Sequence, residues 1–138
     1  MSSTENKAAE RRLVAEVWNK HNSGAVNEFV APDVVMNNAV LALGSGREGY
    51  KRALEAVFAA FPDVQLTIDD LIAEGDLVAE RWTMRGTHQG EFMGIPATNN
   101  RLTLTGIDIY RYADGKRVEA WGHADLAGMM KQLKSHEK

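Results

Sequence analysis

The 138-residue sequence contains no cysteine, and none of its hydrophobic runs is long enough to cross a membrane as a helix. The lack of cysteine excludes disulfides, thiolate metal sites and cysteine nucleophiles. Residues 1–7 also lack the apolar stretch of a signal peptide. We therefore expect a cytoplasmic protein that does not interact with membranes.

No block of basic residues is present either, and the formal net charge is −3. Proteins that bind nucleic acids or anionic membranes carry basic patches, so we expect no nucleic-acid partner. The hydrophobic content of 44% and the charged content of 25% are typical of a globular protein. A chain of this length is expected to form one domain, residues 1–138.

Capping motifs and apolar periodicity predict two helices in the first half of the chain. Residues 2–5 (SSTE) match a capping box, and a helix is expected to follow to about residue 21, with an apolar stripe at Leu13, Val14, Val17 and Trp18. Residues 45–48 (SGRE) match a second capping box, before a helix that ends at Pro62. Between them we expect a short helical turn over residues 25–30 and a short strand over residues 34–38.

The second half of the chain has the two-residue period of strands. Strands are expected over residues 64–74, 77–88, 101–112 and 117–124, with hairpin turns at 74–76 and 113–115 and a loop at 89–100. Gly106 lies where the apolar residues change parity along the third of these strands, which indicates a β-bulge. The pattern predicts an α+β domain in which a curved antiparallel sheet wraps around helices on its concave face. Such a cone-shaped interior suits a small apolar ligand.

Asp125 stands where the last strand ends and a final helix begins. Leu126, Met129, Met130 and Leu133 follow with helical spacing, so Asp125 is a candidate helix N-cap. It also shares a strand face with Trp121 and His123. In an apolar pocket its pKa would rise, and it would serve as a general base. The spacing alone leaves both roles open.

Two histidines are further candidates for acid/base catalysis. His123 lies two residues before Asp125 on the same strand face, and His88 shares parity with Trp82 and Met84. A structural role is equally compatible with either histidine. Asn37, on the short strand, is a candidate for orienting a carbonyl group. The remaining candidates for binding a substrate are large apolar side chains that also suit a core: Trp18, Phe58, Trp82, Phe92, Trp121 and Met129.

Sequence motifs for metals and cofactors are missing. The four histidines show no metal-binding spacing, and there is no nucleophile elbow, phosphate-binding loop or dinucleotide fingerprint. We therefore expect neither a metal nor a cofactor.

Several short motifs, taken together, resemble the SnoaL-like polyketide cyclase family. They are GREGY at 46–50, AFPD at 60–63, AEGD at 73–76, RWT at 81–83, GTHQG at 86–90, FMGIP at 92–96 and DxxGMxxQL at 125–133. The resemblance covers about residues 10–133. It implies the cone-shaped α+β fold that this family shares with ketosteroid isomerase, scytalone dehydratase and nuclear transport factor. The fold commonly dimerises through the convex side of its sheet, so we expect a homodimer.

The resemblance also implies a reaction. Cyclases of this family close a ring on a polyketide ester by an intramolecular aldol condensation, without metal or cofactor, and one aspartate removes the acidic proton. Asp125 matches the position of that aspartate in the final motif, with His88 or His123 assisting. Within the enzyme class, epoxide hydrolysis is a weaker alternative, because no Asp-x-Arg or Arg-x-Asp pair lies on one strand face. Dehydration stays open, because it could use the two histidines. The alternative from another class is a non-catalytic module that binds a small apolar molecule or a protein partner.

Overall fold

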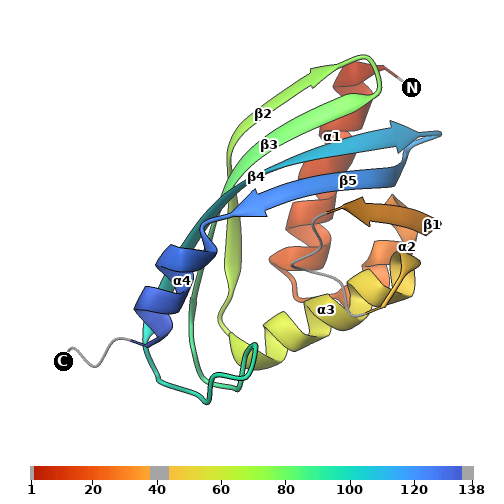
Figure 1. The fold of residues 1–138 in the computed structure, drawn as a ribbon. Coiled ribbons are helices and arrows are strands. Elements are labelled where there is room, and N and C mark those ends of the chain that lie inside the picture. The colour runs from red at the N-terminus through yellow and green to blue at the C-terminus, as the bar shows by residue number, and fades with distance from the viewer. Residues whose placement is uncertain (1, 38–43, 135–138) are drawn as a thin grey trace.

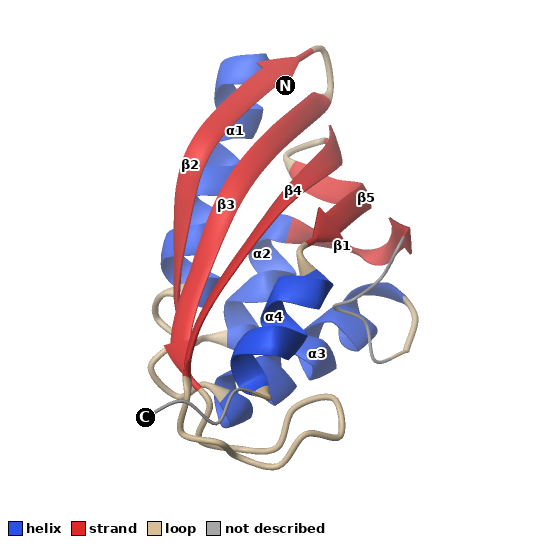
Figure 2. Cartoon of the chain, turned by 60° about the vertical axis from the view of Figure 1, so that its left-hand side comes forward, coloured by secondary structure: helices blue, strands red, loops and turns tan. Residues whose placement is uncertain are grey.

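The computed structural model describes residues 2–37 and 44–134, and it has the predicted α+β fold. The helices lie on one side of a curved five-stranded sheet, as Figures 1 and 2 show. The helical segments are α1 (Ser3–Leu13), a π-helical turn (Val14–Trp18), a 3-10 turn (Ser23–Ala25), α2 (Val26–Phe29), α3 (Gly46–Ala60) and α4 (Leu126–Leu133). The strands are β1 (Val30–Asn37), β2 (Gln65–Glu74), β3 (Leu77–Thr87), β4 (Arg101–Ala113) and β5 (Lys116–Ala124).

The sheet has the order β1-β5-β4-β3-β2, with β2 to β5 antiparallel as predicted. The first strand differs from the expectation, because β1 joins the edge of β5 in parallel. It also begins four residues earlier than predicted, at Val30, and the predicted last residue of that strand, Asn38, lies outside the described residues.

Local capping chemistry confirms one of the two predicted capping boxes. Ser2 and Glu5 exchange hydrogen bonds at the start of α1, as the motif requires. Ser45 precedes α3, but its side chain makes no capping hydrogen bond, so the second predicted box is wrong. The N-terminal stripe packs as predicted, and Leu13 and Val17 are completely buried.

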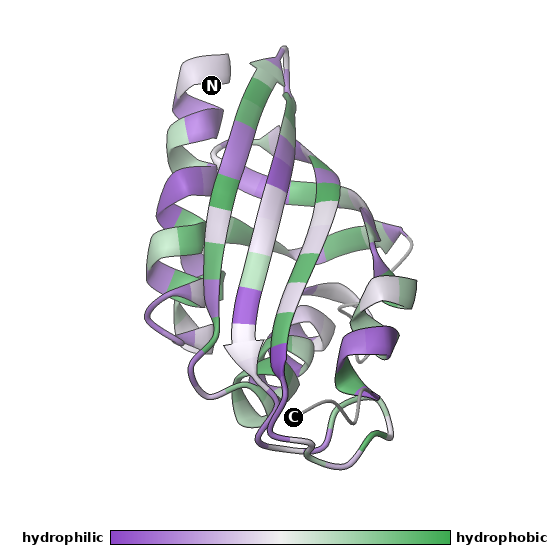
Figure 3. Ribbon diagram, turned by 90° about the vertical axis from the view of Figure 1, so that its left-hand side faces the viewer, coloured by the Kyte–Doolittle hydropathy of each residue, from purple (hydrophilic) through white to green (hydrophobic). Residues whose placement is uncertain are grey.

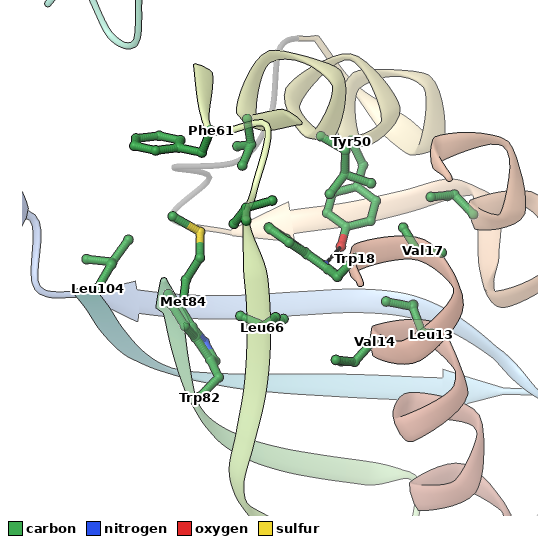
Figure 4. Packing of buried hydrophobic residues seen from close by; sticks show 14 of the residues in the cluster. Leu13, Val14, Val17, Trp18, Tyr50, Phe61, Leu66, Trp82, Met84 and Leu104 are labelled. Atoms are coloured by element: carbon green, nitrogen blue, oxygen red, sulfur yellow. Dashed lines mark hydrogen bonds between the residues drawn. The ribbon is translucent and has the colours of Figure 1, made fainter. Parts of the chain in front are cut away.

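The core fills the space between the concave face of the sheet and the helices. Figure 4 shows the N-terminal stripe facing side chains from the strands, such as Leu66, Trp82 and Met84. The indole Nε1 of Trp18 donates a hydrogen bond to the hydroxyl of Tyr50, 3.2 Å away, which ties the π-helical turn to α3. In Figure 3 hydrophilic and hydrophobic residues alternate along the strands, as expected for a sheet with one buried face.

Gly106 does not form a bulge, which corrects a prediction from the sequence. It pairs in register with Trp82 on one side and Ala124 on the other, and the register shifts lie elsewhere, next to Asp70 and Tyr112. A Cβ atom at Gly106 would collide with the indole ring of Trp82. The glycine therefore leaves room for a large side chain on the neighbouring strand, and the inward-facing positions of β4 continue without a break through Asp108 and Tyr110.

No helix in the described part of the chain is long and apolar enough to span a membrane.

We expect Gly106→Ala to destabilise the fold by about 1–3 kcal/mol, because the added methyl group overpacks the contact with Trp82 and lies 2.8 Å from the carbonyl oxygen of His123. Urea unfolding followed by circular dichroism measures this change. The exposed Thr105→Ala on the outer face of the same strand is the control, with an expected change within about 0.5 kcal/mol. Equal stability of the two variants would contradict a packing role for Gly106.

Candidate functional site

A cavity of about 100 Å³ lies between the concave face of the sheet and the helices. Since one water molecule needs about 10–15 Å³ on this measure, the cavity has room for several waters or a small ring system. Its lining comprises Glu10, Trp18, Met36, Asn37, Tyr50, Val57, Leu66, Glu80, Trp82, Met84, Phe92, Leu104, Asp108, Tyr110, Arg117, Ala120, Trp121, Gly122, His123, Ala124 and Met129.

The lining residues separate by polarity along the strands. Met84, Phe92, Leu104 and Met129 form the apolar end of the cavity. Glu10, Glu80, Asp108, Tyr110 and Arg117 form what we call the polar end. Glu80 and Met84 are four residues apart on β3, so the two ends are separated by about 13 Å of strand. A ligand that fills the cavity is therefore held by apolar contacts at one end and by hydrogen bonds at the other.

Asp108 projects from β4 into the polar end. Its Oδ1 atom accepts a hydrogen bond from Nε1 of Trp82 at 3.2 Å, and its Oδ2 atom accepts one from the hydroxyl of Tyr110 at 2.7 Å. Gly122 on β5 makes room for this carboxyl group, since a Cβ atom there would lie 2.6 Å from Oδ1. Burial raises the pKa of Asp108 above its ordinary value, although both hydrogen bonds act in the opposite direction. The result is a well-oriented carboxylate with increased basicity.

A buried ion pair closes the polar end. Nη2 of Arg117 donates to Oε1 of Glu10 at 2.7 Å, and the hydroxyl of Tyr112 donates to the same oxygen at 2.7 Å. The Arg117 guanidinium also lies 3.5 Å from the centre of the Tyr110 ring. These contacts compensate for the removal of both charges from water, which is required for a buried ion pair to persist. Glu10 is therefore held as an anion.

Glu80 lies beside this ion pair and is 1% exposed. Burial, the negative charge of Glu10 and a hydrogen bond with Glu10 raise the pKa of Glu80 to about 11. At neutral pH its carboxyl group is therefore uncharged. The polar end holds one cation, one anion, one neutral acid and the carboxyl group of Asp108.

The structure places Asp125 at the N-cap of α4. Its Oδ1 atom accepts a hydrogen bond from the backbone N–H of Gly128 at 2.9 Å, which confirms the capping interpretation. The side chain is exposed and is not part of the cavity lining. The capping role is therefore present in the structure, and the predicted part of Asp125 in a reaction stays a prediction.

The two histidines occupy different surroundings. His88 is completely buried, its Nδ1 atom lies 2.9 Å from the hydroxyl oxygen of Thr98, and its ring stacks on Phe61. It does not line the cavity. His123 borders the cavity but is exposed, because its side chain alternates with the inward positions Gly122 and Ala124.

Most of the residues predicted to bind a substrate do line the cavity, namely Trp18, Asn37, Trp82, Phe92 and Met129. Trp121 borders the cavity, but it pairs with Ile109 on the outer face of the sheet, where the Arg111 guanidinium lies 5.7 Å from the centre of its ring. Phe58 does not, because its ring packs against His21, with 4.8 Å between ring centroids. The amide nitrogen of Asn37 donates to the carbonyl oxygen of Ala120 at 3.1 Å, which links β1 to β5.

The polar end was missed in the analysis of the sequence. Glu80 has the same parity as Trp82 and Met84, so the alternation that placed those residues inward also places Glu80 inward. Asp108 has the parity of Leu104, but the bulge predicted at Gly106 hides this alternation, and Asp108 was not among the predicted site residues. The sequence therefore carried a signal for both carboxyl groups, whereas the contact of Glu10 with Arg117 joins residues too distant in the chain for any local pattern.

No group of three or more metal-ligating side chains suited to a metal ion occurs in residues 2–37 and 44–134. The expected absence of a metal stays a prediction.

Comparison with known proteins identifies a family and several similar structures. A family model described as SnoaL-like polyketide cyclase matches residues 8–133. Nogalonic acid methyl ester cyclase of Streptomyces nogalater is 26% identical over 123 residues, covering 87% of this chain and 91% of that protein. The structure of TsrD from Streptomyces laurentii superposes with a TM-score of 0.88 at 28% identity, covering 97% of this chain and 98% of that chain. The structure of IdmH from Streptomyces antibioticus superposes with a TM-score of 0.79 at 33% identity, covering 94% of this chain and 99% of that chain.

Replacing Glu80 by Gln should change how stability depends on pH. In the wild type the folded state keeps the Glu80 proton up to a pKa of about 11, whereas an unfolded chain loses it near 4.5. The free energy of unfolding therefore falls as pH rises through this window, by up to about 1.4 kcal/mol per pH unit. Glu80→Gln has no proton to lose, so its stability relative to the wild type should increase from about pH 5 to pH 8.

Urea unfolding at three pH values across this range measures the effect. Glu74→Gln is the control. It removes an exposed carboxylate from the neighbouring strand, so it shows how the loss of one negative charge by itself changes the pH dependence of the free energy of unfolding. Parallel pH profiles for the wild type and Glu80→Gln would show that Glu80 is ionised in the folded protein.

Proposed function

The chain belongs to the SnoaL-like polyketide cyclase family, and on this basis we propose that it is a cofactor-independent acid/base enzyme. It removes a proton from the carbon next to a carbonyl group of a small, mainly apolar, cyclic substrate. The similarity to a nogalonic acid methyl ester cyclase favours ring closure of a polyketide ester as the overall reaction.

The observation that carries this proposal is the position of Asp108. Its carboxyl group lines the cavity, its pKa is raised by burial, and two donors, Trp82 and Tyr110, hold it in one orientation. A carbon acid requires a base whose basicity is increased by a dry environment, and a fixed orientation brings that base close to the C–H bond. Asp108 meets these requirements, and we assign it the role of general base.

The reaction then proceeds in two steps within the cavity. The Asp108 carboxylate takes a proton from the carbon, and the electron pair of the C–H bond moves into an enolate. The enolate carbon attacks a second carbonyl group of the same molecule, a C–C bond forms, and the new alkoxide takes a proton.

Two alternatives are compatible with the family. In one, Asp125 is the base, as the resemblance in the final motif implies, and its side chain turns from the cap of α4 toward a bound substrate. In the other, the protein binds a small molecule in the same cavity without transforming it. The first alternative predicts that the carboxylate of Asp108 is dispensable for proton abstraction, and the second predicts no proton abstraction at all.

Asp108→Asn and Asp125→Asn form a matched pair for this question. With nogalonic acid methyl ester as the probe, we expect Asp108→Asn to lower the rate of ring closure by about 10²- to 10⁴-fold, the range for loss of a general base. Asp125→Asn should stay within a few-fold of the wild type, because asparagine is also a good N-cap. Chromatography with mass detection follows the product, and exchange of the acidic proton in D₂O, followed by NMR, reports proton abstraction separately.

The opposite pattern, with loss of exchange only in Asp125→Asn, would identify Asp125 as the base. Binding of the probe by the wild type without exchange or turnover above the uncatalysed rate would favour the non-catalytic module.

We also propose that the protein is a homodimer formed through the outer face of its sheet. Ile72, Ala79, Ile109 and Trp121 are paired one after another across β2, β3, β4 and β5. Ile72 is 67% exposed and Ile107, in the next row, is 55% exposed. A continuous apolar row on an otherwise polar sheet face is typical of a protein contact.

Ile109→Glu should convert the dimer to a monomer, because it places an unpaired carboxylate in the apolar row between Ala79 and Trp121. Sedimentation velocity or light scattering measures the mass in solution. Met93→Glu is the control, since Met93 is 51% exposed on the loop between β3 and β4 and lies outside this row. A monomeric wild type, or an unchanged dimer in Ile109→Glu, would contradict this interface.

A further inference from the structure

The polar end contains two buried atoms without a hydrogen-bond partner among the described residues, Oε1 of Glu80 and Nε of Arg117. Glu80 is 1% exposed and Arg117 is 4% exposed, and both residues line the cavity. A buried polar atom without a partner is costly, and in native proteins most such atoms are satisfied. Two of them at one end of a cavity therefore suggest a group that the cavity is built to receive.

The hydrogen-bonding role of Oε1 follows from its surroundings. Glu10 is an anion, because Arg117 and Tyr112 both donate hydrogen bonds to it. Glu80 is hydrogen-bonded to Glu10, and Oε1 has no partner among the described residues. We therefore infer that the single proton of the Glu80 carboxyl group is on the other oxygen, Oε2, and is directed to Glu10. Oε1 is then the carbonyl-type oxygen of a neutral acid, which can only accept a hydrogen bond.

The role of Nε in Arg117 follows in the same way. Nη2 of the guanidinium is engaged by Glu10, and the flat face of the group is stacked on the ring of Tyr110. The Nε–H group has no acceptor among the described residues and can only donate. The polar end thus offers one acceptor and one donor.

We propose that Glu80 and Arg117 form a binding subsite for a neutral hydroxyl group, an alcohol or a phenol. The hydroxyl donates its proton in a hydrogen bond to Oε1 of Glu80, and its oxygen accepts a hydrogen bond from Nε–H of Arg117. A hydroxyl group is both a donor and an acceptor, so it matches the two hydrogen-bonding functions of this pair.

Other chemical groups fit this pair less well. A carboxylate or phosphate would face the carboxyl groups of Glu10 and Asp108, and the charge of Arg117 is already matched by Glu10. An ammonium group would lie against the guanidinium. A ketone or an ether accepts but cannot donate, so Oε1 of Glu80 would be left buried without a partner, which is the situation that gives polar sites their strongest discrimination.

The subsite lies close to the proposed base, because Glu80 and Asp108 are directly paired across β3 and β4. Both side chains face inward, and Cβ atoms of such pairs are about 4.5–5.5 Å apart. The next step rests on the proposed function, in which Asp108 is the general base. In that case the substrate carries a hydroxyl group next to the carbon that loses its proton. This places hydroxylated ring systems, and not simple ketones, in the substrate class.

A binding experiment tests the subsite without requiring turnover. The probes are 2-naphthol, its methyl ether 2-methoxynaphthalene, and the anion 2-naphthoate, with affinities measured by calorimetry or by probe fluorescence at neutral pH. The wild type should bind 2-naphthol about 10- to 100-fold more tightly than the ether, as expected when one buried acceptor is left unsatisfied, and should bind 2-naphthoate more weakly still.

Two substitutions of Glu80 separate the hydrogen bond from packing. Glu80→Gln is a close analogue of the neutral acid, since its amide NH₂ donates to Glu10 and its carbonyl oxygen still accepts from the ligand, so the preference for 2-naphthol should persist within about three-fold. Glu80→Leu introduces an apolar side chain of similar size that has no acceptor, so the preference for 2-naphthol over its methyl ether should disappear. Thermal unfolding of both variants shows that they are folded when the probes are compared.

The proposal is overturned if the wild type binds the alcohol and the ether equally, if it binds neither, or if the preference survives in Glu80→Leu. The proposed function fails separately. If the wild type prefers 2-naphthol but does not catalyse proton exchange, the hydroxyl subsite stands and the role of Asp108 as a general base fails. If the wild type catalyses proton exchange but does not prefer 2-naphthol over its methyl ether, the proposed function stands and the hydroxyl subsite fails.

Discussion

The buried ion pair between Glu10 and Arg117 connects the first helix of the protein to its last strand, and the character of the cavity depends on it. The two residues are 107 positions apart, and their contact holds α1 against the concave face of the sheet. Two charges removed from water persist only with further partners, which Tyr112 and the ring of Tyr110 provide. The ion pair also closes one end of the cavity with polar groups, while the other end stays apolar.

The electrostatics of the polar end follow from this pair. Burial and, after it, the negative charge of the neighbouring Glu10 raise the pKa of Glu80 to about 11, so Glu80 keeps its proton. Asp108, directly across from Glu80 in the sheet, has a raised pKa from burial but is stabilised by two donors. Carboxyl groups in one pocket whose environments differ in this way are suited to different tasks, one as a base and one as a neutral hydrogen-bonding group.

Glycine at two inward positions makes this arrangement sterically feasible. Gly106 accepts the indole ring of Trp82, and Gly122 accepts the carboxyl group of Asp108. Trp82 in turn donates a hydrogen bond to Asp108, so the two glycines together position a base and its donor on neighbouring strands. From the sequence, Gly106 was interpreted as a bulge, and this error hides the inward alternation of β4 that continues to Asp108.

The sequence by itself determined the elements, because their signals are local. The capping box at Ser2 and Glu5, the two hairpin turns and the alternation along the four antiparallel strands depend only on neighbouring residues, and the family motifs added the cone-shaped fold. Local pattern also identified most of the aromatic lining and allowed the capping role of Asp125. Only the tertiary structure decided which carboxyl groups reach the cavity and which ionise. Those properties depend on contacts such as Glu10 with Arg117 and Glu80 with Asp108, and on burial from water, and neither is present in any short stretch of the chain.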